Sequence, residues 1–297
     1  MALAIRQLQK HFVGEVSGLD LRVPLTKEQA AEVEAAMDKY AVLVFHGQDL
    51  TDEQQLAFAL NFGEREKARG GTVVKKEDYR LTSGLNDVSN LGKDGKPLAR
   101  DSRAALFNLG NWLWHSDSSF RPAPAKYSLL SGRIIPSWGA NTEFADMRAA
   151  YDALDQRTKA EVADLICEHS LIYSREAIGF VDLTAEEITA FAPVRHPLVR
   201  RHPVTGRLSL FLSAHAGAIV GWTVPEARMF LRDLTEHATQ REFVYSHAWK
   251  PNDLVMWDNR STMHRARRFD HSEVRDVRRT TLAGHPPAEA SSPVTPR

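Results

Sequence analysis

The stretch FVYSHAWKPNDLVMW, residues 243–257, contains two apolar segments separated by a short polar one. Residues Phe243 to Trp249 and Leu254 to Trp257 are rich in β-branched and aromatic side chains, which favour strands. Between them, Lys250-Pro251-Asn252-Asp253 has the proline, asparagine and aspartate that turns prefer. The pattern predicts a β-hairpin and therefore antiparallel strand pairing.

Other short segments support a mainly β protein with flanking helices. Residues Ala41 to Phe45 read AVLVF, which is typical of a buried strand, and Leu208 to Ser213 alternates less cleanly. Helices and strands do not alternate regularly along the chain, which argues against a doubly wound parallel fold. Four helix starts have a threonine followed three residues later by Glu or Gln, the capping-box spacing: Thr26, Thr51, Thr158 and Thr223.

The chain of 297 residues lacks a Gly/Ser-rich linker, so we expect one domain over residues 1–285. Residues 286–297 are rich in Pro, Ser and Ala and are expected to form a disordered tail. The only cysteine, Cys167, excludes an intrachain disulfide, and its neighbours Leu165 and Ile166 suggest a buried thiol in a helix. A lone cysteine fits a reducing compartment, so we expect a cytoplasmic protein.

Charge and hydropathy narrow the range of partners. Lys plus Arg and Asp plus Glu each total 38, so the formal net charge is zero. This balance gives no general attraction to nucleic acids or anionic membranes, and we expect neither as a partner. No stretch approaches the ~20 apolar residues of a membrane span. Seven arginines nevertheless crowd near the C-terminus: Arg260, Arg265, Arg267, Arg268, Arg275, Arg278 and Arg279.

The sequence WHSDSSF, residues 114–120, is a candidate metal-binding motif. On a strand, residues two apart point to the same face, so His115 and Asp117 could hold one ion together. Two histidines and one carboxylate on one face of an octahedron leave three positions open, as non-haem Fe(II) oxygenases require. The short pattern also fits a structural His–Asp pair, and His271-Ser272-Glu273 is a competing candidate in a charged, loop-like segment.

Candidates for a third ligand and for cations that bind an acidic molecule occur further along the chain. The segment Trp257 to His264 follows an apolar strand and ends in a histidine. Arg275 and Arg279 follow it, and an arginine can hold a carboxylate through two parallel hydrogen bonds. A solvated basic surface is the alternative interpretation, in particular for Arg265, Arg267 and Arg268.

Taken together, these segments resemble the Fe(II)/2-oxoglutarate dioxygenases of the taurine/2,4-dichlorophenoxyacetate family, closest to its aryloxyacetate branch. The resemblance extends from the VSGLDLR region to about Gly284 and is carried by AVLVFHGQ, LWHSDSSF, NTEFADMRAAYDALD, EHATQREFVY and NDLVMWDNR. It implies a double-stranded β-helix, that is, a cupin-like jelly roll with flanking helices. It also implies Fe(II) as the metal, with 2-oxoglutarate and O₂ as co-substrates.

The resemblance assigns roles to individual residues. It implies iron ligation, and hence catalysis, by His115, Asp117 and His264. Residues implied to bind 2-oxoglutarate are Thr142 and Arg275, at its far carboxylate, with Trp257 as an aromatic wall and Asn111 nearby. Arg279 is implied to bind the anionic group of the substrate. Weaker substrate-binding candidates are Lys75, Lys76, Lys96 and His215.

The implied reaction is hydroxylation of a small anionic substrate. For 2,4-dichlorophenoxyacetate, hydroxylation beside the ether oxygen gives a hemiacetal that collapses to a phenol and glyoxylate, with succinate and CO₂ from 2-oxoglutarate. Two differences from the relatives leave the substrate open: the segment from Arg69 to Asn86, and Ala218 in place of a histidine. The alternatives are a taurine, alkyl sulfonate or other aryl-acid dioxygenase, and a non-catalytic β-helix protein that binds a small anion. Relatives often self-associate, so a homo-oligomer is a further expectation.

Overall fold

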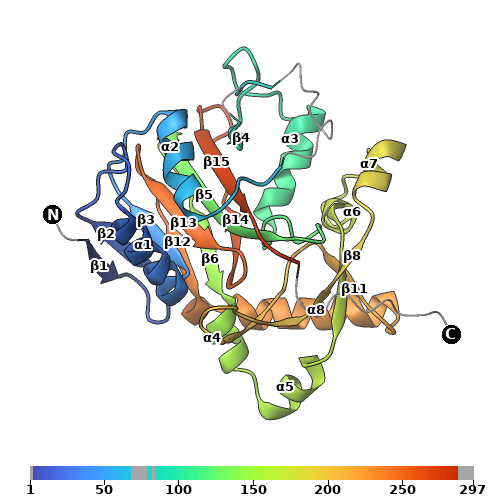
Figure 1. Ribbon diagram of the computed structural model, residues 1–297. Helices are drawn as coiled ribbons and strands as arrows, with labels where there is room; N and C mark the ends of the chain where they lie inside the picture. The colour runs from blue at the N-terminus through green and yellow to red at the C-terminus, as the bar shows by residue number, and fades with distance from the viewer. Residues whose placement is uncertain (1–2, 68–78, 82–83, 287–297) are drawn as a thin grey trace.

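The computed structural model describes residues 3–67, 79–81 and 84–286, and its centre is a large sheet (Figure 1). Seven strands lie in the order β1-β2-β3-β13-β5-β15-β4, and all neighbours are antiparallel except β2 and β3. These strands are β1 (Ala4–Gln7), β2 (Gly14–Ser17), β3 (Val42–Phe45), β4 (Asn86–Asp87), β5 (Ala125–Ile134), β13 (Leu254–Asp258) and β15 (Asp276–Ala283).

A smaller sheet faces the large one. It contains β12 (Val244–His247), β6 (Thr142–Asp146) and β14 (Thr262–Ala266), in that order and antiparallel. Phe144 from the small sheet packs in one buried cluster with Val44, Val255 and Trp257 from the large sheet. Two facing, mainly antiparallel sheets around such a core form a double-stranded β-helix, so the predicted jelly roll with flanking helices is confirmed.

The inner strands β3 and β13 of the large sheet are buried on both faces, which explains their continuous apolar sequences. Val42 and Val44 point into the space between the sheets, whereas Leu43 and Phe45 belong to a second cluster on the outer face. Helices α1 (Lys27–Tyr40) and α2 (Asp52–Ala59) cover that outer face (Figure 1). Each fully buried aliphatic or aromatic side chain here contributes roughly 1.5–3 kcal/mol.

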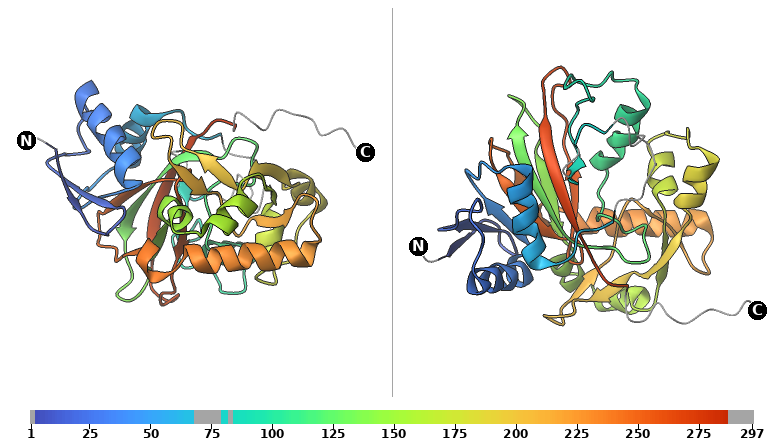
Figure 2. Two further views of the ribbon diagram at one scale, coloured as in Figure 1. Left: turned by 90° about the horizontal axis from the view of Figure 1, so that it is seen from below. Right: turned by 45° about the horizontal axis from the view of Figure 1, so that its top comes forward.

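A third layer lies against the small sheet. Helix α8 (Val224–Ala238) and helix α4 (Met147–Asp152) share a buried cluster with Met263 of β14. Figure 2 shows α8 lying apart from α1, with strands between them. The remaining elements are α3 (Arg103–Asn108), α5 (Gln156–Val162), α6 (Leu171–Glu176), α7 (Ala185–Ala190), β7 (Ile166–His169), β8 (Val194–Pro197), β9 (Val199–Arg201), β10 (Leu208–Leu210) and β11 (Ala216–Ile219), with 3-10 turns at Leu60–Phe62, Leu109–Trp112 and Arg241–Phe243.

The predicted hairpin at residues 243–257 is wrong. Both strands exist, but β12 pairs with β6 in the small sheet, and β13 pairs with β3 and β5 in the large one. The turn is real, with Asn252 at φ 67° and the Asp253 amide bonded to the Lys250 carbonyl at 3.1 Å. It is a corner between two sheets, and its backbone bonds to Gly132 of β5. A turn motif specifies the local bend and not the strand that each arm pairs with.

The helix predictions are largely confirmed. Thr26, Thr51 and Thr223 form capping boxes at the starts of α1, α2 and α8. The fourth start is displaced, because the Asp155 side chain, not that of Thr158, caps α5. Cys167 is fully buried as predicted, but it lies in β7 and not in a helix.

Within the described ranges, none of the helices combines the length and apolar character needed to cross a membrane. Residues 287–297 of the expected tail, and the predicted substrate residues Lys75 and Lys76, lie outside the described residues.

Candidate metal and co-substrate site

The two predicted histidine ligands are brought together by backbone pairing. The edge of β14 that faces away from β6 bonds to the segment around His115: the amides and carbonyls of His115 and His264 form reciprocal bonds of 3.0 and 2.8 Å. Residues directly opposed in an antiparallel pair project their side chains to the same side. The two imidazole centroids are therefore only 4.2 Å apart.

Asp117 completes the group, although not on a regular strand. His115 forms an isolated bridge and Asp117 lies in a turn, where Ser118 has φ 56°. Nε2 of His115 lies 3.9 Å from Oδ1 of Asp117, and Nε2 of His264 lies 3.8 Å from Oδ2. All three residues are buried, and one ligand atom from each lies within 4.8 Å of the others. The three side chains therefore form one compact group that could hold a metal ion.

The protonation states also suit a divalent cation. Burial lowers the pKa of His115 despite the Asp117 carboxylate, and burial together with His115 lowers that of His264 well below its usual value. Burial raises the pKa of Asp117, but the positive charge of Arg279, helped by the hydrogen bond from Ser128, outweighs burial and holds the pKa at about 2. The site therefore offers two neutral imidazoles and one ionised carboxylate. Nδ1 of His115 lies 2.8 Å from the Leu113 carbonyl, which can accept a hydrogen bond from Nδ1–H and so leaves Nε2 for the metal.

Two uncharged residues orient the carboxylate, and the sequence pattern indicates neither as a site residue. Ser128 on β5 donates to Oδ2 of Asp117 at 2.7 Å, and the Asp117 amide donates to Oδ1 of Asn259 at 3.0 Å. The Asn259 amide nitrogen in turn donates to Ser128 at 3.0 Å, and the Trp257 indole donates to Asn259 at 3.1 Å. The only sequence signal is that Asn259 lies two residues beyond the end of the predicted strand Leu254 to Trp257.

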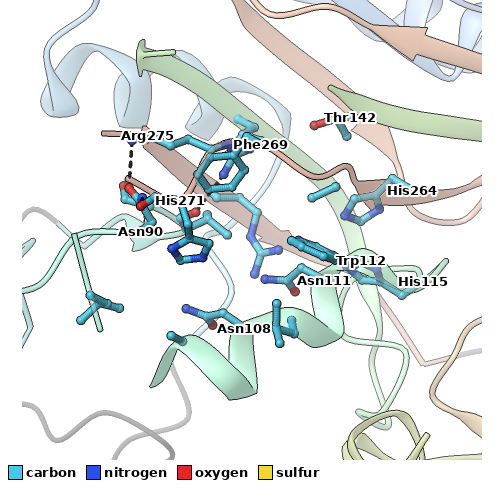
Figure 3. Close-up of a pocket in the computed structure, with 18 of the residues that line it drawn as sticks. Asn90, Asn108, Asn111, Trp112, His115, Thr142, His264, Phe269, His271 and Arg275 are labelled. Carbon is cyan, nitrogen blue, oxygen red and sulfur yellow. Dashed lines mark hydrogen bonds between the residues drawn. The ribbon is translucent and has the colours of Figure 1, made fainter. Parts of the chain in front are cut away.

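The predicted 2-oxoglutarate residues line one pocket with the histidines (Figure 3). His115 and His264 lie at one end, and Arg275 lies at the other, beside Asn90. Thr142 is on β6 and its hydroxyl accepts a hydrogen bond from Trp249 at 2.9 Å. The pocket also includes Asn111 and Trp257, whose ring centroid lies 4.7 Å from that of His264.

Arg275 is suited to an anion. It is buried, its Nη1 donates to the Val88 carbonyl at 3.1 Å, and its Nε has no partner in the described part of the chain. Burial lowers its pKa to about 10, a value at which it stays charged near pH 7. A buried guanidinium without a carboxylate partner is costly unless an anion joins it. Arg275 can therefore hold a carboxylate at the end of the pocket opposite the metal ligands.

Arg279 lines the same pocket but already has an acidic partner. Arg279 follows Val277 by two residues on β15, and Val277 points into the core between the sheets. Its Nη1 donates to Oδ1 of Asp117 at 2.6 Å. The predicted substrate-binding arginine thus contacts a predicted metal ligand, which the sequence did not indicate.

The two weaker substrate-binding candidates that the structure describes do not line the pocket. Lys96 is exposed in a turn that the Gly92 amide closes on the Lys96 carbonyl, and it is not among the residues that line the pocket. His215 is buried behind the site, with its ring centroid 6.0 Å from that of His115 and its Nδ1 3.0 Å from the Ser174 hydroxyl. The competing metal motif at His271 is wrong, because Glu273 instead accepts hydrogen bonds from Ser137.

His271 is nevertheless a lining residue of the pocket. Its ring stacks on Phe269 at 5.3 Å, and both side chains lie on the Arg275 side in Figure 3. The predicted loop therefore contributes to the pocket wall and not to metal binding.

The comparisons with known proteins agree with this geometry. Residues 4–281 match the family described as taurine catabolism dioxygenase TauD, TfdA family. The α-ketoglutarate-dependent 2,4-dichlorophenoxyacetate dioxygenase of Cupriavidus pinatubonensis is 46% identical over 283 residues, which cover 95% of this chain and 98% of that one. The (S)-phenoxypropionate/α-ketoglutarate-dioxygenase of Sphingobium herbicidovorans is 38% identical over 299 residues, 98% of each chain.

A solved structure is more similar still. The crystal structure of AAD-2 in complex with Mn(II) and N-oxalylglycine has 71% sequence identity and a TM-score of 0.95, and it covers 97% of this chain and 99% of that one. A match of this extent confirms both the predicted fold and the predicted dioxygenase class. The chain belongs to the TauD/TfdA family of dioxygenases.

Proposed function

We propose that this protein is an Fe(II)- and 2-oxoglutarate-dependent dioxygenase that cleaves an aryloxyacetate, such as 2,4-dichlorophenoxyacetate, to a phenol and glyoxylate. The observation that carries the proposal is one pocket with a candidate metal-binding group at one end and, at the other, a buried guanidinium that has no carboxylate partner among the described residues. We further propose that residues 1–285 form the single catalytic domain, that the enzyme is cytoplasmic, and that it forms a homo-oligomer.

The metal and co-substrate assignments follow from the donor chemistry. His115, Asp117 and His264 would hold Fe(II), and Arg275 with Thr142 would hold the far carboxylate of 2-oxoglutarate. N-oxalylglycine, bound by the AAD-2 relative together with Mn(II), carries the same oxalyl group and distal carboxylate as 2-oxoglutarate. Bound Fe(II) and 2-oxoglutarate would supply O₂ activation, with decarboxylation of 2-oxoglutarate to succinate.

The residues of the chain would provide binding and orientation. Arg279 would take the anionic group of the substrate, which fixes the distance between that group and the metal ligands. Trp257 and Leu130 give the pocket apolar walls that exclude water from the reacting carbon. Hydroxylation of the carbon beside the ether oxygen produces a hemiacetal, and its collapse releases the phenol and glyoxylate.

Substrate identity is proposed from relatives. The 2,4-dichlorophenoxyacetate enzymes are 46% identical, whereas an alkylsulfatase of Acinetobacter baylyi is 30% identical. An activity panel tests this choice by measuring succinate and phenol with 2,4-dichlorophenoxyacetate, phenoxyacetate, taurine and an alkyl sulfate. Phenol release from the aryloxyacetates is expected, and succinate formation with taurine or the alkyl sulfate alone would overturn the substrate assignment.

A separate experiment addresses catalysis itself. Anaerobic addition of Fe(II) and 2-oxoglutarate should give a weak visible charge-transfer band, which a non-catalytic anion-binding protein would lack. His264→Ala should lose both the band and iron-dependent turnover, because only two of the three protein ligands would remain to hold the metal. Full activity in this variant would refute the ligand assignment.

A further inference from the structure

The ion pair between Arg279 and Asp117 links a candidate metal ligand to the arginine that is proposed to bind the substrate. Asp117 is a member of the metal-binding group, and Arg279 is the proposed partner of the substrate anion. Nη1 of Arg279 lies 2.6 Å from Oδ1 of Asp117, and both side chains are largely enclosed. Nε of Arg279 is buried and has no partner among the described residues. One guanidinium is thus bonded to the carboxylate on one side and has a free donor on the other.

Arg275 provides a contrast within the same strand region. Its hydrogen bonds go to a carbonyl, and burial is the only cause of its lowered pKa. Its charge is therefore available to an anion whether or not a metal is present. The charge of Arg279, in contrast, is balanced by Asp117 until something else takes up the charge of the carboxylate.

Formal charges show what a metal ion would change. Without metal, Asp117 and Arg279 cancel and Arg275 leaves one positive charge. A divalent ion on the neutral histidines and Asp117 would raise the excess to three positive charges. Dianionic 2-oxoglutarate and a monoanionic substrate together carry three negative charges. The loaded site is neutral only when both acids are bound.

We propose that Arg279 couples metal binding to anion binding. In the metal-free protein the guanidinium is held by the ligand carboxylate, and a metal ion on Asp117 releases it for the anionic group of the substrate. The inference rests on the proposed function only for the identity of that anion. Because coupling between two ligands is reciprocal, the anion must tighten metal binding by the same factor as the metal tightens anion binding.

The first experiment measures this reciprocity on the full-length chain. Mn(II) is titrated with and without saturating phenoxyacetate, in the absence of 2-oxoglutarate, and free Mn(II) is followed by electron paramagnetic resonance. We expect phenoxyacetate to tighten Mn(II) binding by at least about fivefold, the lower end of typical coupling. In Arg279→Met the tightening should disappear. In Arg279→Lys the lysine presents a compact charge that cannot bond to both the Asp117 carboxylate and the substrate anion. This variant should therefore lose most of the tightening.

The second experiment releases Arg279 without a metal. Phenoxyacetate binding is measured by calorimetry on chelator-treated wild type, Asp117→Asn, Arg279→Met and the double variant. Asp117→Asn should bind phenoxyacetate at least about fivefold more tightly than wild type, and this gain should vanish when Arg279 is methionine. A gain that persisted in the Arg279→Met background would reflect loss of general repulsion and not release of the guanidinium.

Glu66→Gln is the matched control for loss of a nearby negative charge. Glu66 is half-buried in the same electrostatic neighbourhood, but its carboxylate bonds to Ser118 and Arg121 instead. Glu66→Gln should therefore tighten phenoxyacetate binding much less than Asp117→Asn does. Thermal unfolding by circular dichroism identifies any variant that does not fold.

The outcomes separate this inference from the proposed reaction. Equal Mn(II) affinity with and without phenoxyacetate in wild type, or undiminished coupling in Arg279→Met, would overturn the inference. Failure of Asp117→Asn to gain affinity for phenoxyacetate would do the same. Intact coupling together with no phenol release would overturn only the proposed reaction.

Discussion

Replacing Ser128 by alanine should weaken metal binding although Ser128 is not itself a ligand. Its hydroxyl donates to Oδ2 of Asp117 at 2.7 Å and accepts from the Asn259 amide at 3.0 Å. Asn259 in turn holds the Asp117 backbone amide. Alanine at position 128 therefore removes one hydrogen bond from the carboxylate and disconnects the amide that positions its backbone.

The expected magnitude follows from these contacts. A hydrogen bond to a charged group contributes ~1.5–3 kcal/mol, and 1.4 kcal/mol corresponds to a factor of ten in affinity. Mutation of a residue that orients a metal ligand typically weakens metal affinity by about 10–100-fold. We therefore expect the Mn(II) dissociation constant of Ser128→Ala to rise by at least about tenfold.

Ser131→Ala is the matched control, because Ser131 is a buried serine on the same strand whose side chain bonds on the opposite face. Its hydroxyl donates to Gln55 at 2.6 Å, away from Asp117. Both variants should lose a similar free energy of unfolding in urea, about 1 kcal/mol. Isothermal titration with Mn(II) separates them. The reasoning is refuted if Ser128→Ala binds Mn(II) like wild type, or if Ser131→Ala weakens binding equally.

Three further outcomes are expected. Arg275→Ala should raise the 2-oxoglutarate concentration needed for half-maximal succinate formation by about tenfold or more, since a charge-assisted pair is lost, and an unchanged requirement would exclude this role. Burial, with Arg200 nearby, lowers the pKa of His196 to about 4, so the unfolded chain protonates first as the pH falls. The free energy of unfolding should then decrease from about pH 6.5 to about pH 4, by at most ~1.4 kcal/mol per unit from this residue, and urea unfolding of His196→Gln should show a flatter dependence. Burial raises the pKa of Cys167 to about 12, so the native thiol should not react with a disulfide reagent at pH 8 until urea unfolds the protein; rapid native labelling would contradict its burial.

Local signals in the sequence predicted the local structure well. The capping boxes at Thr26, Thr51 and Thr223 mark true helix starts, because the bonds they describe lie within four residues. The short apolar segment around Cys167 was ambiguous between helix and strand, since a few apolar residues fit both periods. The strands that pair with β12 and β13 could not be predicted from the sequence, for a different reason. Strand pairing is decided by distant segments, and the turn between them is the same whether it closes a hairpin or a corner.

Some residues of the site could likewise be predicted from the sequence, and others could not. The metal ligands could be recognised because histidine and carboxylate are the residue types that metals require, and because family resemblance linked positions 115 and 264. The supporting residues Ser128 and Asn259 could not, because serine and asparagine occur throughout any chain. Their role appears only through register: Ser128 lies opposite Trp257, and Asn259 follows two residues later.

Strand register therefore sets the chemistry of the site as well as the fold. On the inward face of β15 the apolar Val277 is followed by Arg279, and Arg279 lies opposite Leu130 of β5. The core between the sheets thus changes from apolar to charged within one step along the strand. Because the charged part adjoins that buried core, the histidines stay neutral and the ion pair stays close. A slip of one residue in β15 would turn Arg279 to the opposite face, so the pairing that builds the jelly roll also decides which cation reaches Asp117.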